Sequence, residues 1–234
     1  MKRRIFIAIN LPEKIKKRLK EYREKFNYLP VRWTKVPSLH LTLVFIGYVD
    51  NEQMLEACKI TRKIAEDTEP FFINFKKIVL GPPGKEPRMV WLEGEKSEEL
   101  TRLRDALQEA LFSADTGFNH KESRSFSPHI TLARITPHTL IKSQDSRING
   151  GNKGSFIIDK NNQKGVGVKM GEWPARQRPE PQAMAGGRQA QINPAEIETD
   201  FSAPVEVNSI EVMESDLKFD GAEYATLEEC PLGG

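Results

Sequence analysis

The sequence predicts a layered domain of the α+β or α/β class, in which helices pack on a sheet. Strand-like and helix-like patterns alternate along the first 135 residues of the 234-residue chain. A short apolar strand that begins with His-[Leu/Ile]-Thr-Leu occurs twice, at 40–43 and 129–132, and indicates a weak internal repeat. A chain of this length can bury an apolar core, either as one large domain or as two small lobes. The repeat favours two similar lobes that face each other.

The first predicted elements are a strand, a helix and a second strand. Residues 4–10 form a short, β-branched apolar run, which predicts a buried strand. Pro12 suits the first turn of a helix, and apolar residues then repeat at helical spacing at Ile15, Leu19 and Tyr22. Residues 40–46 predict the second strand, which Gly47 is expected to close.

Two more helices and three strands are predicted between residues 50 and 135. Asp50 and Gln53 have the spacing of a capping box, so a helix of about four turns should begin there. From Ser97 onwards an amphipathic helix is predicted by the spacing of Leu100, Leu103, Leu107 and Leu111. Strands are predicted at 71–80, 88–92 and 129–135, with a Gly-Pro-Pro-Gly turn at 81–84.

Residues 143–200 differ in composition from the rest of the chain. They are rich in Gly, Asn, Gln, Arg and Pro and show no helical period, so we expect a disordered insertion here. This insertion would interrupt a single domain that spans residues 1–234. Beyond it, strands are predicted at 205–213 and 222–227, separated by a turn at Asp220-Gly221.

Composition narrows the classes of function. The net charge is only +2, so the chain as a whole lacks the strong positive potential that is typical of nucleic-acid-binding proteins. A local basic groove would be sufficient to bind a small nucleotide. Cys58 and Cys230 have neither metal-ligand spacing nor a disulfide pattern, and we expect both to be small buried apolar residues. The N-terminal apolar run is too short for a secretion signal, and no stretch is long enough to cross a bilayer. A cytoplasmic protein that does not engage a membrane is therefore expected.

The two His-x-Thr motifs are the candidate chemical groups. In a strand, side chains at i and i+2 lie on one face, so His40 points with Thr42 and His129 points with Thr131. Their neighbours Leu41, Leu43, Ile130 and Leu132 would then face the core. Imidazole moves protons near neutral pH, and a threonine hydroxyl can donate to a phosphate oxygen. Two such pairs facing each other predict a phosphodiester site, with one histidine as proton acceptor and the other as proton donor.

The remaining candidates are weaker. His120 and His138 lack this context and are expected on the surface. No His, Cys, Asp and Glu residues have metal-ligand spacing, so a metallohydrolase is not predicted. Aromatic side chains near the motifs could stack on a nucleobase. For Phe45 ordinary packing is favoured, whereas for Trp33 and Phe126 packing and base stacking are equally supported.

The sequence resembles the two-histidine (2H) phosphoesterases, and within them the RNA 2′,3′-cyclic phosphodiesterases, which are also called 2′–5′ RNA ligases or LigT-like proteins. The resemblance covers residues 1 to about 135 and extends to 205–232. The matching segments fall in the family's order and spacing, and they are 5–12, 39–47, 90–92, 126–134, 214–217 and 221–224. The long segment at 143–200 departs from the family, whose connection there is shorter.

The resemblance implies an α+β bilobal fold with two antiparallel sheets, flanked by helices, around a central cleft. It implies that no metal or organic cofactor is needed. His40 would protonate the departing ribose 3′ oxygen, and His129 would activate the attacking water. Thr42 and Thr131 would hold the phosphate oxygens, and Arg134 matches a family arginine near the phosphate. Judged from the sequence without the resemblance, Arg134 has an alternative interpretation, namely a solvent-exposed arginine at the end of a strand.

The function that follows is hydrolysis of a 2′,3′-cyclic phosphodiester to a 2′-phosphate. The expected partner is RNA with a 2′,3′-cyclic phosphate end, or a cyclic nucleotide, and the chain is expected to be a monomer. One alternative is joining of RNA halves through a 2′–5′ linkage, which is essentially the reverse reaction. Another is an RNA- or nucleotide-binding module without turnover, although binding alone would not need two proton-transfer groups.

Overall fold

The computed structural model describes residues 2–113, 116–118, 126–135, 194–218 and 221–233. Its strands are β1 (Arg3–Asn10), β2 (Val31–Trp33), β3 (His40–Val49), β4 (Phe71–Gly81), β5 (Met89–Gly94), β6 (His129–Ile135), β7 (Thr199–Val207), β8 (Ser209–Lys218) and β9 (Gly221–Pro231). Its helices are α1 (Glu13–Lys25), α2 (Asn51–Glu66), α3 (Glu98–Leu111), the short α4 (Pro194–Ile197) and the 3-10 turn η1 (Val36–Ser38).

These strands form one connected antiparallel sheet in the part of the chain that the structure describes. The order is β7-β4-β5-β6-β3-β1-β8-β9, and β2 pairs with β6 beside this path. The two His-x-Thr strands, β3 and β6, are hydrogen-bonded neighbours through Leu41 and Ile130. The sequence led us to expect two separate sheets, but this pairing joins the two halves into one sheet.

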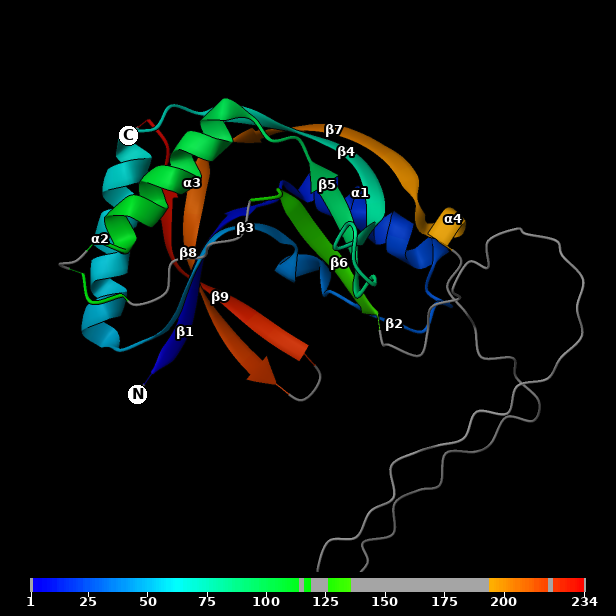
Figure 1. Ribbon diagram of the computed structural model, residues 1–234, viewed down its shortest axis with the longest axis horizontal. Coiled ribbons are helices and arrows are strands. Elements are labelled where there is room, and N and C mark those ends of the chain that lie inside the picture. The colour runs from blue at the N-terminus through cyan, green and yellow to red at the C-terminus, as the bar shows by residue number, and fades with distance from the viewer. Residues whose placement is uncertain (1, 114–115, 119–125, 136–193, 219–220, 234) are drawn as a thin grey trace, which may run out of the picture. The chain divides into compact units, whose positions relative to one another are not determined.

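The sheet is curled, as Figure 1 shows. The connection between β7 and β8 makes the curl evident, because Asn208 alone separates these strands in sequence. In the sheet, β4, β5, β6, β3 and β1 lie between them. One residue can bridge that gap only if the sheet bends round so that its two sides approach each other.

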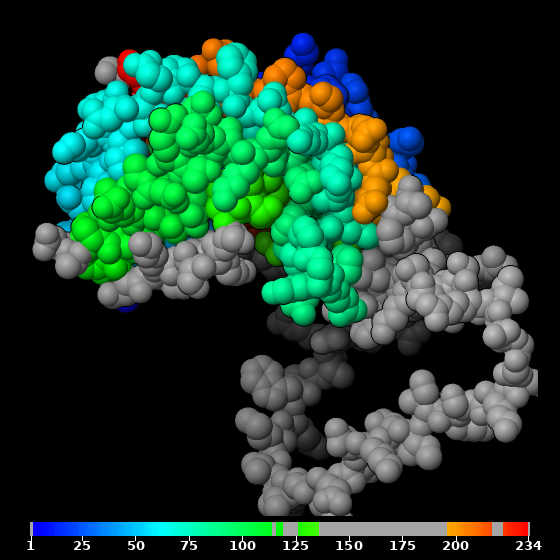
Figure 2. Space-filling view, turned by 45° about the horizontal axis from the view of Figure 1, so that its top comes forward, coloured from blue at the N-terminus to red at the C-terminus, as the bar shows by residue number. Residues whose placement is uncertain are grey.

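The two faces of the sheet have different roles. One face packs against the three long helices in the main apolar core, which includes Leu41, Leu43, Ile130 and Leu132 together with the leucines of α3. Figure 2 views the molecule from a side on which α2 (cyan) and α3 (green) cover the strands. The opposite face carries a smaller apolar cluster of Phe6, Ala8 and Met213, against which Tyr224 packs. The predicted orientation of the four motif neighbours is confirmed.

Local sequence signals account for the helix starts. Asp50 accepts a hydrogen bond from the Gln53 amide, and the Gln53 side chain accepts one from Asp50, so the predicted capping box is present. Ser97 accepts from the amide of Leu100 and caps α3. Both caps satisfy amides that the first helical turn leaves without a partner.

Three expectations about the strands need correction. Gly47 does not close the second strand: it has a positive φ of 98° beside a β-bulge, and β3 continues to Val49. The expected strand at 205–213 is the end of β7 and the start of β8, on different sides of the sheet. The predicted insertion lies mostly outside the described residues, but its last part, 194–200, forms α4 and the start of β7.

Both cysteines are buried, as expected. Burial raises the pKa of the Cys58 thiol to about 12 and that of Cys230 to about 11. Among the described helices, none is long and apolar enough to span a membrane.

The core assignment predicts how two leucines respond to truncation. Leu107 of α3 is completely buried, whereas Leu55 of α2 is 57% exposed. We expect Leu107→Ala to lower the free energy of unfolding by about 2–5 kcal/mol because it leaves a cavity. The control Leu55→Ala should change it by less than about 0.5 kcal/mol. Urea unfolding measures both, and equal effects would contradict the assigned core.

Candidate active site

Strand pairing brings the two His-x-Thr motifs side by side. Leu41 pairs with Ile130 in antiparallel register. Continuing this register places His40 across from Thr131 and Thr42 across from His129, on the same face. The sequence predicted pairs that face each other from two lobes, but the structure has them as neighbours on adjacent strands. The continued register therefore places the four side chains on one face of two adjacent strands.

The same backbone contact holds each histidine ring. Nδ1 of His40 donates to the carbonyl oxygen of Ser38 at 2.8 Å, and Nδ1 of His129 donates to that of Ser127 at 2.8 Å. A carbonyl oxygen can only accept, so the proton of the neutral imidazole resides on Nδ1. In this tautomer Nε2 is the basic nitrogen of the ring, which can accept a proton and can donate it again when the ring is charged.

Aromatic rings enclose His40. Its ring centroid lies 4.9 Å from that of Phe6 and 4.9 Å from that of Tyr224. This burial lowers the pKa of His40 below its ordinary value of 6.5, and the nearby charge of His129 acts in the same direction. The hydrogen bond to Ser38 and the carboxylate of Glu211 oppose that change.

A tryptophan supports His129. The Trp91 indole stacks on the imidazole with a centroid distance of 3.8 Å and an interplanar angle of 22°. Gly81 of β4 also lies against the indole, where any Cβ would collide with the ring. The stack of Trp91 on His129, with Gly81 against the indole, fixes the orientation of the imidazole.

Three hydrogen-bond donors converge on the sulfur of Met89. Trp91 Nε1 lies 3.5 Å from Sδ, Thr131 Oγ1 lies 4.0 Å away and Arg134 Nη1 lies 4.0 Å away. A thioether is a weak acceptor, so these donors gain little from it. Donors that converge beside His129 could instead bind an anion, because charge-assisted bonds to phosphate are stronger.

A β-bulge brings Arg134 to this face. Strict alternation from His129 would place residue 134 on the helix side with Ile130. Thr131 pairs with Trp91 and Ala133 with Val90, so β6 has one extra residue between them. The extra residue reverses the alternation, and Arg134 is exposed on the same side as Thr131.

The aromatic residues proposed for stacking are arranged differently from the expectation. Trp33 packs against the main core, and Phe126 lies under the guanidinium of Arg104 in that core. Phe45 is 44% exposed and its ring contacts Phe6, next to His40. Phe45 thus packs on a neighbouring ring, as expected, but a large part of its surface remains exposed. His120 and His138 fall outside the described residues.

Four residues around the histidines were not identified from the sequence, namely Phe6, Met89, Trp91 and Glu211. Alternation along β1 could have placed Phe6 opposite the core isoleucines. The other three depend on strand pairings between segments distant in sequence, which no local pattern reveals.

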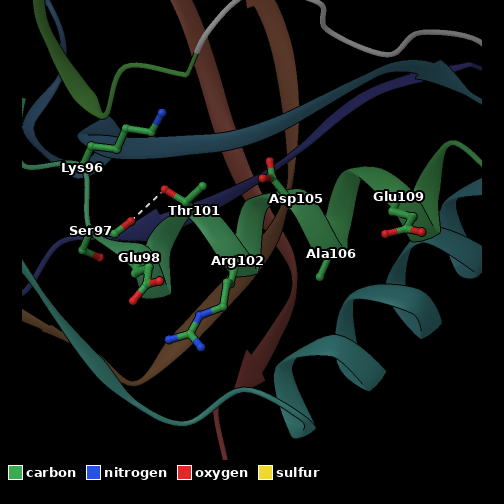
Figure 3. A pocket seen from close by; sticks show the side chains of 8 residues that line it. All are labelled: Lys96, Ser97, Glu98, Thr101, Arg102, Asp105, Ala106 and Glu109. Carbon is green, nitrogen blue, oxygen red and sulfur yellow. Dashed lines mark hydrogen bonds between the residues drawn. The ribbon is translucent and has the colours of Figure 1, made fainter.

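Two further observations concern other kinds of site. In the described part of the chain, no group of three or more His, Cys, Asp or Glu side chains is placed to hold a metal ion. A hollow runs along the outer face of α3, away from the sheet, and Figure 3 shows its lining. Charges of both signs alternate there, from Lys96 and Glu98 to Arg102 and Asp105, and the hollow is separate from the histidine face.

Known proteins match both the sequence and the fold. The family model described as the 2′-5′ RNA ligase superfamily matches residues 11–149, which is more than half of the chain. The RNA 2′,3′-cyclic phosphodiesterase of Methanocaldococcus jannaschii is 30% identical over 132 residues, covering 56% of this chain and 71% of the relative. The chain belongs to the 2′-5′ RNA ligase superfamily.

Other known proteins extend the likeness. The RNA 2′,3′-cyclic phosphodiesterase of Bacillus subtilis is 33% identical over 130 residues, covering 55% of this chain and 69% of the relative. The crystal structure of Escherichia coli LigT complexed with 3′-AMP has a TM-score of 0.62 at 19% identity and covers all of both chains. This structural likeness concerns the curled antiparallel sheet and its helices.

The stack on His129 can be tested by NMR. Replacing Trp91 with leucine removes the ring current from the imidazole, so we expect the His129 ring protons to move downfield. The ring protons of His40, which contact Phe6 and Tyr224, serve as the internal control and should move little. Unchanged His129 resonances in the folded Trp91→Leu protein would contradict the stacking.

Proposed function

We propose that this protein hydrolyses 2′,3′-cyclic phosphodiesters at RNA ends to 2′-phosphates. One observation carries the proposal: two imidazoles lie on one face of adjacent strands, each with Nδ1 hydrogen-bonded to the backbone carbonyl two residues earlier. A displacement at phosphorus needs one group that removes a proton and one that supplies a proton.

The proposed reaction uses these groups in sequence. Nε2 of His129 takes a proton from water as its oxygen bonds to phosphorus. The bond between phosphorus and the 3′ oxygen breaks, and Nε2 of charged His40 donates its proton to that oxygen. The product carries a 2′-phosphate and a 3′-hydroxyl, and proton exchange with solvent restores both histidines. The division of labour between them follows the family resemblance.

The remaining polar groups would bind the phosphate. Thr131 and Arg134 already direct donors toward a weak acceptor beside His129, and an anionic phosphate is the stronger partner. Thr42, which lies across from His129 in the continued register, would hold a second phosphate oxygen. Because protein groups perform both proton transfers, we expect neither a metal nor a cofactor to be required.

The substrate class is supported by the relatives and by the exposed aromatic rings. The curated relatives are named for RNA 2′,3′-cyclic phosphates, and the LigT crystal holds 3′-AMP. On this chain, Phe45 and Tyr48 of β3 are 44% and 64% exposed. Exposed aromatic side chains stack on single-stranded bases. An RNA end, or a cyclic nucleotide, bound by a monomer is the proposed complex.

A second candidate is formation of a 2′–5′ linkage, which the superfamily's name favours. The same two histidines would catalyse the same displacement with an RNA 5′-hydroxyl in place of water: its oxygen bonds to phosphorus, its proton goes to His129, and the 3′ oxygen leaves with a proton from His40. Incubating RNA with a 2′,3′-cyclic phosphate end together with RNA bearing a free 5′-hydroxyl separates the two functions by product length.

Removing either histidine tests the proposed mechanism. We expect His40→Ala and His129→Ala each to lower hydrolysis of a 2′,3′-cyclic nucleotide by about 10²–10⁴-fold, because each removes a proton-transfer group. His120→Ala is the matched control and should retain activity. The assay is run in EDTA, and phosphorus NMR identifies the position of the product phosphate. Full activity in either motif variant would refute the mechanism.

Replacing Arg134 tests whether this side chain binds the phosphate or is only a solvent-exposed residue. We expect Arg134→Ala to lower kcat/KM by roughly 10- to 100-fold, through the loss of a charge-assisted bond. Arg102→Ala, on the outer face of α3, removes the same charge far from the histidines and should change it less than about 2-fold. Equal rates for the two variants would identify Arg134 as a surface residue.

A further inference from the structure

Glu211 is a buried carboxylate on the histidine face of the sheet. It is 5% exposed and lies on β8 directly across from Ala8 of β1. Ala8 in turn lies across from Thr42 on β3. Residues directly across from each other in antiparallel strands point to the same side. Glu211 is therefore two strands away from the His-x-Thr motif of β3, with only a methyl group between them.

The surroundings of Ala8 indicate where the Glu211 side chain lies. Ala8 has no exposed surface, although its own side chain is a single methyl group. Larger side chains from the flanking strands must therefore cover it, and Glu211 is its direct neighbour on one of them. The carboxylate accepts a hydrogen bond of 2.7 Å from Thr226 Oγ1 of β9, which holds it in place.

A buried carboxylate normally requires a positive partner. Within the described residues, no lysine or arginine forms an ion pair with Glu211. Its charge acts instead on His40. The other titratable groups described beside His40 are His129 on β6 and Tyr224 on β9, and its partner across the strand pair is the uncharged Asn10 of β1. Glu211 is thus the negative charge among these neighbours.

We propose that Glu211 is a positioning residue that stabilises the protonated form of His40 during turnover. This inference rests on the proposed function, in which His40 is the proton donor. The aromatic enclosure of His40 disfavours the imidazolium, and a fixed carboxylate on the same face offsets that effect. Thr226 prevents the carboxylate from rotating away.

The test compares Glu211→Gln with Glu229→Gln. Glutamine retains the size and an acceptor for Thr226 but removes the charge. Glu229 lies across from Glu211 on β9, carries the same charge and is exposed to solvent, so it is the matched control. The readouts are the pH dependence of kcat/KM on a 2′,3′-cyclic nucleotide and the NMR titration of His40, assigned with His40→Ala.

The sign of the effect is determined by the role of His40. An acid must be protonated, so activity is present below its pKa and is lost as pH rises through it. Glu211 raises the pKa of His40, so removal of its charge moves both the titration and the alkaline limb to lower pH. We expect this shift to lower kcat/KM about 3- to 10-fold at pH 8 and less than 2-fold on the acid side. Glu229→Gln should shift neither.

Different outcomes separate this inference from the proposed function. An unchanged His40 titration in folded Glu211→Gln overturns the inference even if the enzyme hydrolyses the substrate. A raised KM with an unchanged pH profile also overturns it, because Glu211 would then contact substrate. If the His40 titration shifts but the protein hydrolyses no substrate, the interaction between Glu211 and His40 is supported and the proposed function is rejected. If Glu211→Gln does not fold, Thr226→Val provides the test: a His40 titration at lower pH supports the inference, and an unchanged one refutes it.

Discussion

The pairing of β3 with β6 through Leu41 and Ile130 is the contact on which the site depends. It joins the two halves of the sheet, and it determines which residues lie next to each other on the open face. Leu41 and Ile130 are both completely buried, so the register is coupled to the apolar core. If either strand slipped by one residue, its apolar side chains would turn outward and its histidine would turn inward. The register of β3 against β6 therefore determines both the arrangement of the histidines and the packing of the core.

The two histidines have similar backbone contacts but different neighbours. Each donates from Nδ1 to the carbonyl two residues earlier. His40 sits between Phe6 and Tyr224 with a buried carboxylate nearby, whereas His129 stacks on one indole. An internal repeat can thus supply two equivalent groups, and the surrounding strands can then make them unequal, as an acid and a base require.

Much of this arrangement followed from local sequence patterns. The strand at 129–135, the capping box at Asp50 and the core-facing leucines were predicted correctly, because each depends on neighbours within a few residues. The exposure of Phe45 was not predicted, because strict alternation from Leu41 would place this side chain in the core. A β-bulge between the pairs Ala8–Thr42 and Ile7–Val44 reverses the alternation. Trp91 and Glu211 reach the histidines only through strand order, which joins segments far apart in sequence.

The segment after residue 193 supplies a strand to each side of the sheet, with Asn208 as the point of division. β7 pairs with β4 in one half, while β8 and β9 complete the other half beside β1. Both histidine motifs are made long before these strands during synthesis on the ribosome. Glu211 and Tyr224 follow both motifs in the chain, so the surroundings of His40 are complete only after β8 and β9 have left the exit tunnel. Competence for proton transfer at His40 therefore waits for strands that are synthesised more than 150 residues after His40 itself.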